Sequence, residues 1–290
     1  MDISIITNPN SGRGQGPARA AALTTSLLRR GHRVEVHAGK SREDAAAWAS
    51  THSAHAERLV VVGGDGSMSA ILPGLGEDSP PLMLAPLGTG NVLANELGMP
   101  CSPNELASLL ENGRVQKFDI AEVGNRRSFM VWGFGFDGEI TRRLEEKRSG
   151  AIRKSDYLPL VISTLAAGNT PLQNVTADGE DLGEFAYGII TNIRSYGTPA
   201  LRLGPTAYDD GKWELYLLRK MNVQSIASAA GNALIGRLRK SGSIHHTSAS
   251  VVKVEGADPA PFQVDGDYAG TTPVNFTLGG LQISLVTPRQ

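Results

Sequence analysis

Short apolar strands that run directly into glycine-rich segments constrain the fold of this chain more than any other feature. Asp2–Thr7 is a β-branched run that ends at Asn8-Pro9, and Leu59–Val62 and Leu82–Ala85 each lead into a glycine cluster. The patterns between them predict two helices and one further strand: Pro17–Arg30, Arg33–His37 and Glu43–Thr51. This alternation predicts a mostly parallel, doubly wound sheet with helices on both faces.

From about Val115 onward, the pattern changes to apolar runs that are separated by turn residues. The strands predicted there are Gln116–Val123, Phe129–Phe134, Glu184–Asn192, Lys212–Leu218, Ser248–Val254 and Leu281–Val286. Helices are predicted near Asp137–Lys147, Leu158–Ala167 and Gln224–Arg239. The sequence therefore predicts an α/β domain over residues 1–120 and a mainly antiparallel, β-rich domain over residues 121–290, whose last strand can return to the first domain.

Three glycine-rich loops each follow a predicted parallel strand, so all three should emerge at the carboxyl edge of one sheet. They are Asn8–Gly14, Gly63–Ser67 and Leu87–Asn91. Open α/β sheets bind ligands at this edge, and glycines let backbone N–H groups approach a phosphate closely. One such loop alone is more often an ordinary tight turn, but three at one edge predict a phosphate-binding site.

Two acidic positions allow both a chemical and a structural interpretation. Asp65 lies inside a phosphate-type turn, where a carboxylate is useful if it reaches Mg²⁺, a water or an attacking hydroxyl. The alternative is an Asx-turn, in which Asp65 accepts N–H groups of its own loop. Asp265 and Asp267 would face one cleft if their segment is extended, and the alternative is a plain Asp-Gly turn.

The composition limits the partners and the location of the protein. Lys and Arg number 28 and Asp and Glu 29, a net charge of -1 that argues against a general nucleic-acid partner. The single cysteine, Cys101, excludes an internal disulfide. No apolar run approaches the ~20 residues of a membrane span, and no signal-peptide pattern is present, so we expect a cytoplasmic protein. The sequence does not fix the oligomeric state, and a homodimer is compatible with it.

A basic run surrounds the helix that is predicted near residues 137–147. Its members are Arg142, Arg143, Lys147, Arg148, Arg153 and Lys154. Such a cluster can attract anionic lipid headgroups and give a transient membrane-surface contact. Glu139, Glu145 and Glu146 interleave with it, which favours an ordinary solvated helix face instead.

The order and spacing of these motifs resemble the diacylglycerol kinase catalytic-domain family, which includes bacterial lipid kinases and sphingosine kinases. The first half carries Asn8-Pro9-x-Ser11-Gly12-x-Gly14, Gly63-Gly64-Asp65-Gly66-Ser67 and Gly88-Thr89-Gly90-Asn91. The second half adds Gly133–Asp137, Pro205–Lys212 and Val264–Asp267. The resemblance covers essentially the whole chain, whereas Gly-Gly-Asp-Gly alone also occurs in NAD kinases.

This resemblance implies an ATP-dependent transfer of the γ-phosphate to a hydroxyl of a lipid, such as diacylglycerol, a related glycerolipid or a sphingoid base. The residues that it assigns to ATP are Asn8, Pro9, Ser11, Gly12, Gly14, Gly63, Gly64, Asp65, Gly66, Ser67, Met68, Ser69, Gly88, Thr89 and Asn91. It also implies a structural Mg²⁺, in addition to the Mg²⁺ that accompanies ATP. The ligands implied for that ion are the Asp210 carboxylate and the carbonyls of Ala207 and Lys212.

An acidic side chain must accept the proton of the lipid hydroxyl, and the resemblance offers Asp267 and Asp65. We favour Asp267 as the general base and Asp65 in a network of Mg²⁺ and water. Asp267 replaces the family's usual Glu, and Val92 stands where many members have Asp. These departures keep two alternatives open: an NAD kinase-like phosphotransferase and a nucleotide-binding regulator that has lost catalysis.

Overall fold

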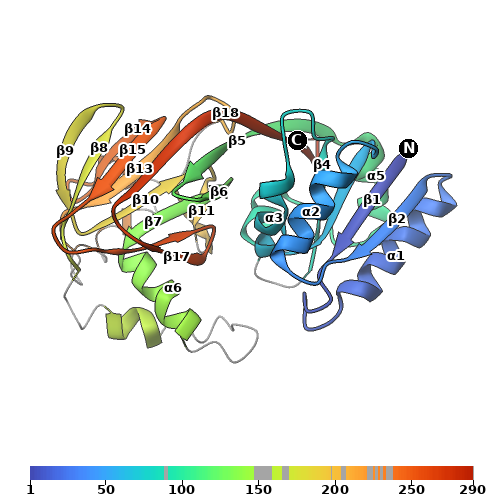
Figure 1. The fold of residues 1–290 in the computed structure, drawn as a ribbon, viewed down its shortest axis with the longest axis horizontal. Coiled ribbons are helices and arrows are strands. Elements are labelled where there is room, and N and C mark those ends of the chain that lie inside the picture. The colour runs from blue at the N-terminus through green and yellow to red at the C-terminus, as the bar shows by residue number, and fades with distance from the viewer. Residues whose placement is uncertain are drawn as a thin grey trace. The chain divides into compact units, whose positions relative to one another are not determined.

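The chain folds into two compact units in the computed structural model (Figure 1). Unit 1 contains Met1–Ile120 and Gly280–Gln290, and unit 2 contains Ala121–Gly279. Two strands pass from one unit into the other, β5 (Arg114–Val123) and β18 (Val274–Thr287). The structure describes residues 1–289 except 88–90, 147–158, 165–169, 197, 204–206, 221–224, 226–227, 229–230 and 233–237.

A parallel sheet with the strand order β2-β1-β3-β4-β18 forms the centre of unit 1. Its elements are β1 (Asp2–Thr7), α1 (Gly16–Arg29), β2 (Arg33–Ala38), α2 (Arg42–His52), β3 (Arg58–Gly63), α3 (Asp65–Ile71), the 3₁₀ turn η1 (Leu72–Gly74), β4 (Leu82–Pro86), α4 (Val92–Leu97) and α5 (Pro103–Asn112). The chain moves outward from β1 to β2 and then back across β1 to β3, so β1 and β3 form the switch point of the sheet. Right-handed crossovers place α1 on one face and α2 and α3 on the other, and α1 packs with α5 while α2 packs with α3.

Local sequence explains the elements of unit 1. The strands β1, β3 and β4 are buried almost throughout, because helices cover both faces of a parallel sheet. Helix α1 buries Leu23 and Leu27 on one face. Helix α2 begins at the N-cap Ser41, whose hydroxyl accepts the N–H of Asp44 at 3.1 Å.

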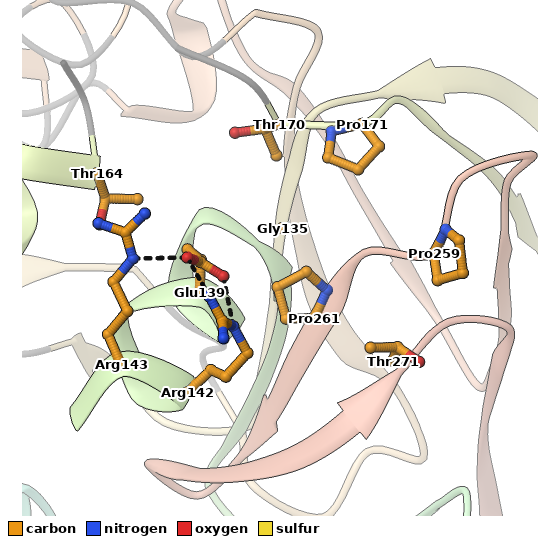
Figure 2. A pocket seen from close by; sticks show the side chains of 10 residues that line it. All are labelled: Gly135, Glu139, Arg142, Arg143, Thr164, Thr170, Pro171, Pro259, Pro261 and Thr271. Atoms are coloured by element: carbon orange, nitrogen blue, oxygen red, sulfur yellow. Dashed lines mark hydrogen bonds and ion pairs between the residues drawn. The ribbon is translucent and has the colours of Figure 1, made fainter. Parts of the chain in front are cut away.

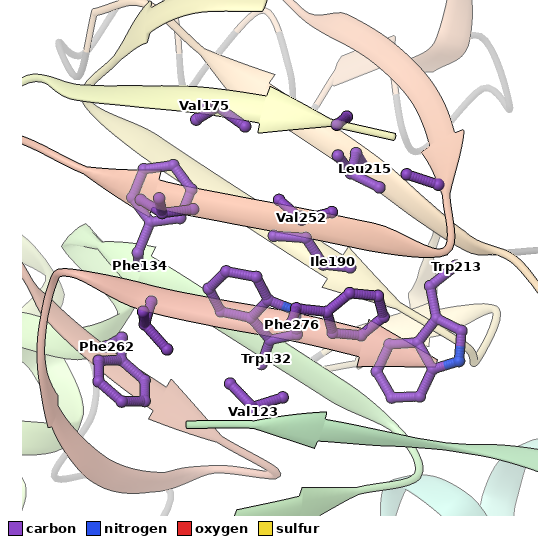
Figure 3. Close-up of a cluster of buried hydrophobic side chains, with 14 of the residues drawn as sticks. Val123, Trp132, Phe134, Val175, Ile190, Trp213, Leu215, Val252, Phe262 and Phe276 are labelled. Carbon is purple, nitrogen blue, oxygen red and sulfur yellow. The ribbon is translucent and has the colours of Figure 1, made fainter. Parts of the chain in front are cut away.

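Unit 2 contains two antiparallel sheets around an apolar core. One has the order β14-β13-β10-β7-β16-β17, and the other contains β18, β15, β8 and β9. The bounds are β6 (Arg126–Ser128), β7 (Val131–Gly135), α6 (Phe136–Glu146), β8 (Gln173–Ala177), β9 (Glu180–Phe185), β10 (Tyr187–Thr191), β11 (Ser195–Tyr196), β12 (Thr198–Arg202), β13 (Trp213–Leu218), the 3₁₀ turn η2 (Leu238–Lys240), β14 (His245–Ala249), β15 (Val251–Glu255), β16 (Pro261–Val264) and β17 (Asp267–Thr271). Both sheets contribute to the core in Figure 3, where the rings of Trp213 and Phe276 lie 5.2 Å apart. The predicted fold class, a mainly parallel α/β part followed by an antiparallel β-rich part, is confirmed.

Two strand predictions were wrong because each apolar run contains a turn. The run 248–254 is divided between β14 and β15, which belong to different sheets. The Asp178 carboxylate turns the chain there by accepting the N–H groups of Ser250 and Val251 at 3.0 and 2.8 Å. The run 184–192 is likewise divided at Ala186, between β9 and β10.

The helices of unit 2 are described only in part. The prediction near Asp137–Lys147 corresponds to α6, while Lys147 lies outside the described residues. Residues 159–164 are helical within the predicted 158–167, and most of the predicted 224–239 lies outside the described residues. Among the helices that are described, none combines the length and the apolar character needed to cross a membrane.

Candidate active site

The three glycine-rich loops of unit 1 meet at the switch point between β1 and β3. Ser11 Oγ lies 3.4 Å from Ser67 Oγ, and the N–H of Leu87 donates to the carbonyl of Gly63 at 2.9 Å. A Cβ added at Gly12 would lie 3.2 Å from the Cβ of Leu87. The loops therefore share one edge of the sheet, whereas their binding of ATP stays a prediction. Gly88 and Thr89 lie outside the described residues.

The first loop is shaped by its own backbone. The N–H of Ser11 donates to the carbonyl of Asn8, and the N–H of Gly14 donates to the carbonyl of Ser11. Gly12, Arg13 and Gly14 have positive φ values of 57°, 60° and 84°. Glycine adopts this region without steric cost, which explains the glycines on both sides of Arg13. The loop leads into α1, which has no acidic residue in its first turn. No carboxylate of that turn would therefore repel an anion at the start of α1.

Gly64 and Gly66 differ in the space around them. A Cβ at Gly64 would lie 2.6 Å from Oδ1 of Asn91, so this glycine allows the second and third loops to pack together. A Cβ at Gly66 would meet no described atom within 4 Å, and Gly66 does not have a left-handed φ. Among the described residues, no packing contact requires glycine at position 66, whereas the close approach of a ligand would require it.

We expect Gly66→Ala to weaken nucleotide binding at least about tenfold without loss of stability. A methyl group would occupy the open space beside the loop, while alanine in α3 should raise the free energy of unfolding by up to ~1 kcal/mol. Calorimetric titration with ATP and thermal unfolding would measure the two effects. The control is Gly76→Ala, because Gly76 of unit 1 also has no atom within 4 Å of its added Cβ. Unchanged ATP affinity in Gly66→Ala would remove Gly66 from the site.

Asp65 caps the start of α4. Its Oδ2 accepts the N–H of Val92 at 2.8 Å, and its Oδ1 accepts the N–H of Leu93 at 3.2 Å. Burial raises the pKa of Asp65, and the two N–H donors oppose that shift. These two N–H groups belong to the first turn of α4, which follows the third loop, and not to Asp65's own loop, so the structure differs from the Asx-turn alternative. Each carboxylate oxygen keeps a further lone pair, which a water can use.

The other residues assigned to ATP fall into two groups. Gly63, Met68 and Ser69 are buried, and the amide of Asn91, which is also buried, donates to the carbonyl of Leu87 at 3.1 Å. The side chain of Met68 therefore belongs to the core of unit 1. The residues with partly or fully exposed positions are Asn8, Pro9, Ser11, Gly12, Gly14, Gly64, Gly66 and Ser67.

The candidate base Asp267 follows a tight turn of unit 2. Asp265 and Gly266 form the two residues between β16 and β17, with φ values of 49° and 89°, and Val264 pairs with Asp267. Two positive φ values in a two-residue hairpin are typical of a type I′ turn. Of the two alternatives, the backbone adopts the plain Asp-Gly turn, and the segment from Asp265 to Asp267 is not extended.

Asp265 and Asp267 have different surroundings. Asp265 is 8% exposed, and its carboxylate accepts the Ser128 hydroxyl at 2.7 Å and the N–H groups of Met130 and Val131 at 3.2 and 3.0 Å. Asp267 is only partly buried. Asp265 is thus a structural carboxylate that ties the hairpin to β7, and Asp267 is the more exposed member of the pair.

A buried acid that the motifs did not single out, Asp137, lies at the start of α6. Its Oδ1 accepts the hydroxyl of Tyr196, and its Oδ2 accepts Nε2 of Gln263 at 2.8 Å. Burial raises the pKa of Asp137, and both donors oppose the shift. The glycines around Asp137 marked its position, but nothing in the sequence linked it to Gln263, which lies 126 residues further on.

The residues implied for Mg²⁺ lie before β13. Asp210 is exposed, and its Oδ1 accepts the N–H of Lys212 at 3.2 Å. One carboxylate and two peptide carbonyls form an oxygen donor set of the kind that Mg²⁺ prefers, so Asp210, Ala207 and Lys212 fit the ion in donor type. No group of three His, Cys, Asp or Glu residues that could hold a metal occurs among the described residues.

Unit 2 also contains a pocket of about 330 Å³ beside α6 (Figure 2). Its lining residues are Gly135, Glu139, Arg142, Arg143, Thr164, Thr170, Pro171, Pro259, Pro261 and Thr271. Glu139 accepts hydrogen bonds from both Arg142 and Arg143, at 2.7 and 2.6 Å. These two members of the basic run are therefore paired on their own helix. The other four, Lys147, Arg148, Arg153 and Lys154, lie outside the described residues.

Comparison with known proteins supports the resemblance that the motifs suggested. Residues 2–123 match the model of the diacylglycerol kinase catalytic domain. Diacylglycerol kinase of Bacillus subtilis (strain 168) is 26% identical over 99% of this chain and 96% of that protein. The enzyme of the same name from Mycobacterium tuberculosis (strain H37Rv) is 23% identical over 99% of this chain and 95% of that protein.

Solved structures agree in fold. A crystal structure of a diacylglycerol kinase from Bacillus anthracis str. Sterne has a TM-score of 0.74 at 20% identity, and the match covers 99% of this chain and 96% of that chain. The match of residues 2–123 to the diacylglycerol kinase catalytic domain supports a kinase that acts on lipids. Residues 2–123 therefore belong to the diacylglycerol kinase catalytic domain family.

Proposed function

We propose that this chain is an ATP-dependent lipid kinase that phosphorylates a hydroxyl of diacylglycerol, a related glycerolipid or a sphingoid base. The observation that carries the proposal is the meeting of three glycine-rich loops at the switch point between β1 and β3. Backbone N–H groups gathered in glycine-rich loops beside helix starts bind phosphate groups. The relatives named diacylglycerol kinase support a lipid as the acceptor. A lipid acceptor also requires a transient contact with a membrane surface.

In this proposal, unit 1 binds the nucleotide and unit 2 binds the lipid. Asp267 accepts the proton of the lipid hydroxyl, whose oxygen attacks the γ-phosphorus as the bond to ADP breaks. Asp65 orients a water near the Mg²⁺ of the nucleotide with the lone pairs that its bonds to Val92 and Leu93 leave. Phosphoryl transfer needs positioning and charge neutralisation more than covalent chemistry, so this division of roles is sufficient.

The test is transfer of labelled γ-phosphate from ATP to a panel of micellar lipids, with and without Mg²⁺. Label in one organic-phase product, dependent on Mg²⁺, would support the proposal and identify the acceptor. Phosphorylation of NAD⁺ without any labelled lipid would support the NAD kinase-like alternative. Binding of ATP without either product would support the nucleotide-binding regulator.

We expect Asp210→Ala to lower the rate of transfer at least about tenfold, because loss of a metal ligand or its orienting partner has effects of this size. In the proposal, Mg²⁺ would be held by Asp210 and the carbonyls of Ala207 and Lys212, and would stiffen this segment. The control is Asp209→Ala, a neighbouring exposed acid without an assigned role. Full activity of Asp210→Ala with an unchanged dependence on Mg²⁺ would remove the structural metal from the proposal.

A further inference from the structure

We propose that Asp137 is a positioning residue for Asp267 and that it acts through Gln263. The inference rests on the proposed function, since Asp267 is its candidate base. It is carried by a continuous chain of side-chain and backbone contacts within unit 2, from the Asp137 carboxylate through the Gln263 amide to the N–H of Gly266. We call this the Asp137–Gln263–Gly266 chain.

The chain ends at the peptide that precedes the candidate base. The N–H of Gly266 donates to Oε1 of Gln263 at 2.7 Å, and Asp267 is the next residue and the first of β17. Gly266 lies at a φ of 89°, and glycine has more backbone freedom than any other residue. A hydrogen bond to this N–H therefore fixes the direction in which the backbone enters Asp267.

Asp137 determines which way the Gln263 amide is turned. The carboxylate can only accept, so it requires Nε2 of Gln263, and this leaves Oε1 to accept the N–H of Gly266. Gln263 is 1% exposed, so solvent does not offer a replacement for either bond. If the amide turned over, an oxygen would face the carboxylate and an NH₂ group would face the N–H. Only one of the two amide orientations satisfies both ends of the chain.

The acid itself is held firmly. The Tyr196 hydroxyl donates to the other carboxylate oxygen and is also hydrogen-bonded to Tyr187. Helix α6 lies very close to β16 at the next residue, because a Cβ at Gly138 would be only 2.1 Å from the carbonyl of Pro261. The helix that carries Asp137 and the strand that carries Gln263 are thus in direct backbone contact.

The β16–β17 hairpin has anchors other than the Asp137–Gln263–Gly266 chain. Asp265 already ties the turn to Ser128, Met130 and Val131, and its own N–H donates to the carbonyl of Val131 at 2.8 Å. The Asp137–Gln263–Gly266 chain adds a bond at the other residue of the turn, on the side of Asp267. We therefore assign anchoring to Asp265 and the orientation of Asp267 to Asp137.

The decisive experiment exchanges the carboxylate and the amide of the Asp137–Gln263–Gly266 chain between positions 137 and 263. Asp137→Asn removes the group that fixes the direction of the Gln263 amide, because the amide introduced at position 137 can present either its oxygen or its NH₂ group to Gln263, and this weakens the bond to Gly266. The double variant Asp137→Asn with Gln263→Glu restores the pattern, because the carboxylate introduced at position 263 accepts from both the NH₂ group introduced at position 137 and the Gly266 N–H. The kcat of Asp137→Asn should fall about 10- to 100-fold with little change in KM, as expected for a misplaced catalytic group. The double variant should recover most of the loss.

A second measurement does not depend on activity. Hydrogen exchange at the Gly266 amide should accelerate in Asp137→Asn and in Gln263→Met, and should slow again in the double variant. Asp178→Asn is the matched control, because Asp178 also fixes a turn of unit 2, at Ser250, and it should leave both kcat and Gly266 unchanged. If Asp137→Asn does not fold, Gln263→Met provides the same test from the other end of the bond.

Two results would overturn the proposal. One is a Gly266 amide that does not respond to Asp137→Asn or Gln263→Met. The other is a double variant that regains protection at Gly266 but no turnover, because Asp137 would then act on the substrate directly. If the wild-type protein transfers no phosphate while Gly266 responds as expected, the proposed function fails and the coupling of Asp137 to the turn is supported.

Discussion

Asp265→Ala is expected to lower the free energy of unfolding by about 4 kcal/mol, which is at the upper end for a single substitution. The change would leave the Ser128 hydroxyl and the N–H groups of Met130 and Val131 buried without their acceptor. Each buried donor that loses its partner costs about 1–3 kcal/mol, and such costs add incompletely. Urea unfolding, followed by the fluorescence of the buried Trp132 and Trp213, would measure the loss.

Asp178→Ala is a closely matched control for that measurement. Asp178 likewise accepts several hydrogen bonds, from Ser250 N–H, the Ser250 hydroxyl and Val251 N–H, and its φ of 47° is close to the 49° of Asp265. The two positions differ mainly in that Asp178 is exposed. Its substitution should cost only about 1–2 kcal/mol, because water can satisfy the donors that are left. Equal losses at the two positions would contradict a special role for the burial of Asp265.

The largest expected effect on turnover belongs to Asp267. Asp267→Ala should lower kcat by about 10²- to 10⁴-fold, the usual contribution of a general base. Stability should change little, because the side chain is only partly buried and the turn before it is fixed by Asp265 and Gln263. Rapid-quench measurement of a single turnover with labelled ATP would isolate the chemical step from product release.

Asp267→Glu separates the loss of the base from a general disturbance of the hairpin. Glu is the usual residue of the resembling family at this position, and it keeps the carboxylate with one additional methylene. Activity within about tenfold of the wild type is expected, since the acceptor of the proton remains. A kcat for Asp267→Ala close to the wild-type value would transfer the role of the base to Asp65.

Sequence patterns predicted the parallel sheet of unit 1 because β1, β3 and β4 are buried, largely apolar runs. In unit 2, exposed strands were missed. The strand β17 has no buried residue, and β9 has only one, Phe185. The divided runs 184–192 and 248–254 were missed for a different reason. An apolar run does not reveal that a distant carboxylate, such as Asp178, bonds the backbone in its middle.

The candidate site shows the same limit. Glycine spacing predicted that the three loops share an edge, since parallel strands bring their carboxyl ends together. It did not predict that Asp65 bonds Val92 and Leu93, because hydrogen bonds between loops depend on how the loops pack. Asp137 and Gln263, 126 residues apart, are brought together by the antiparallel pairing of β7 with β16 and by the packing of α6 on β16.

The path of β18 has a consequence for biosynthesis. Its residues from Gly280 onward belong to unit 1, where Leu285 pairs with Leu82 of β4, but they follow all of unit 2 in the chain. The sheet of unit 1 therefore stays one strand short while the ribosome makes Ala121–Gly279. During that time, β4 presents an apolar edge on which another chain could pair. Unit 2 can thus complete its fold before unit 1 does, although unit 1 begins at the first residue.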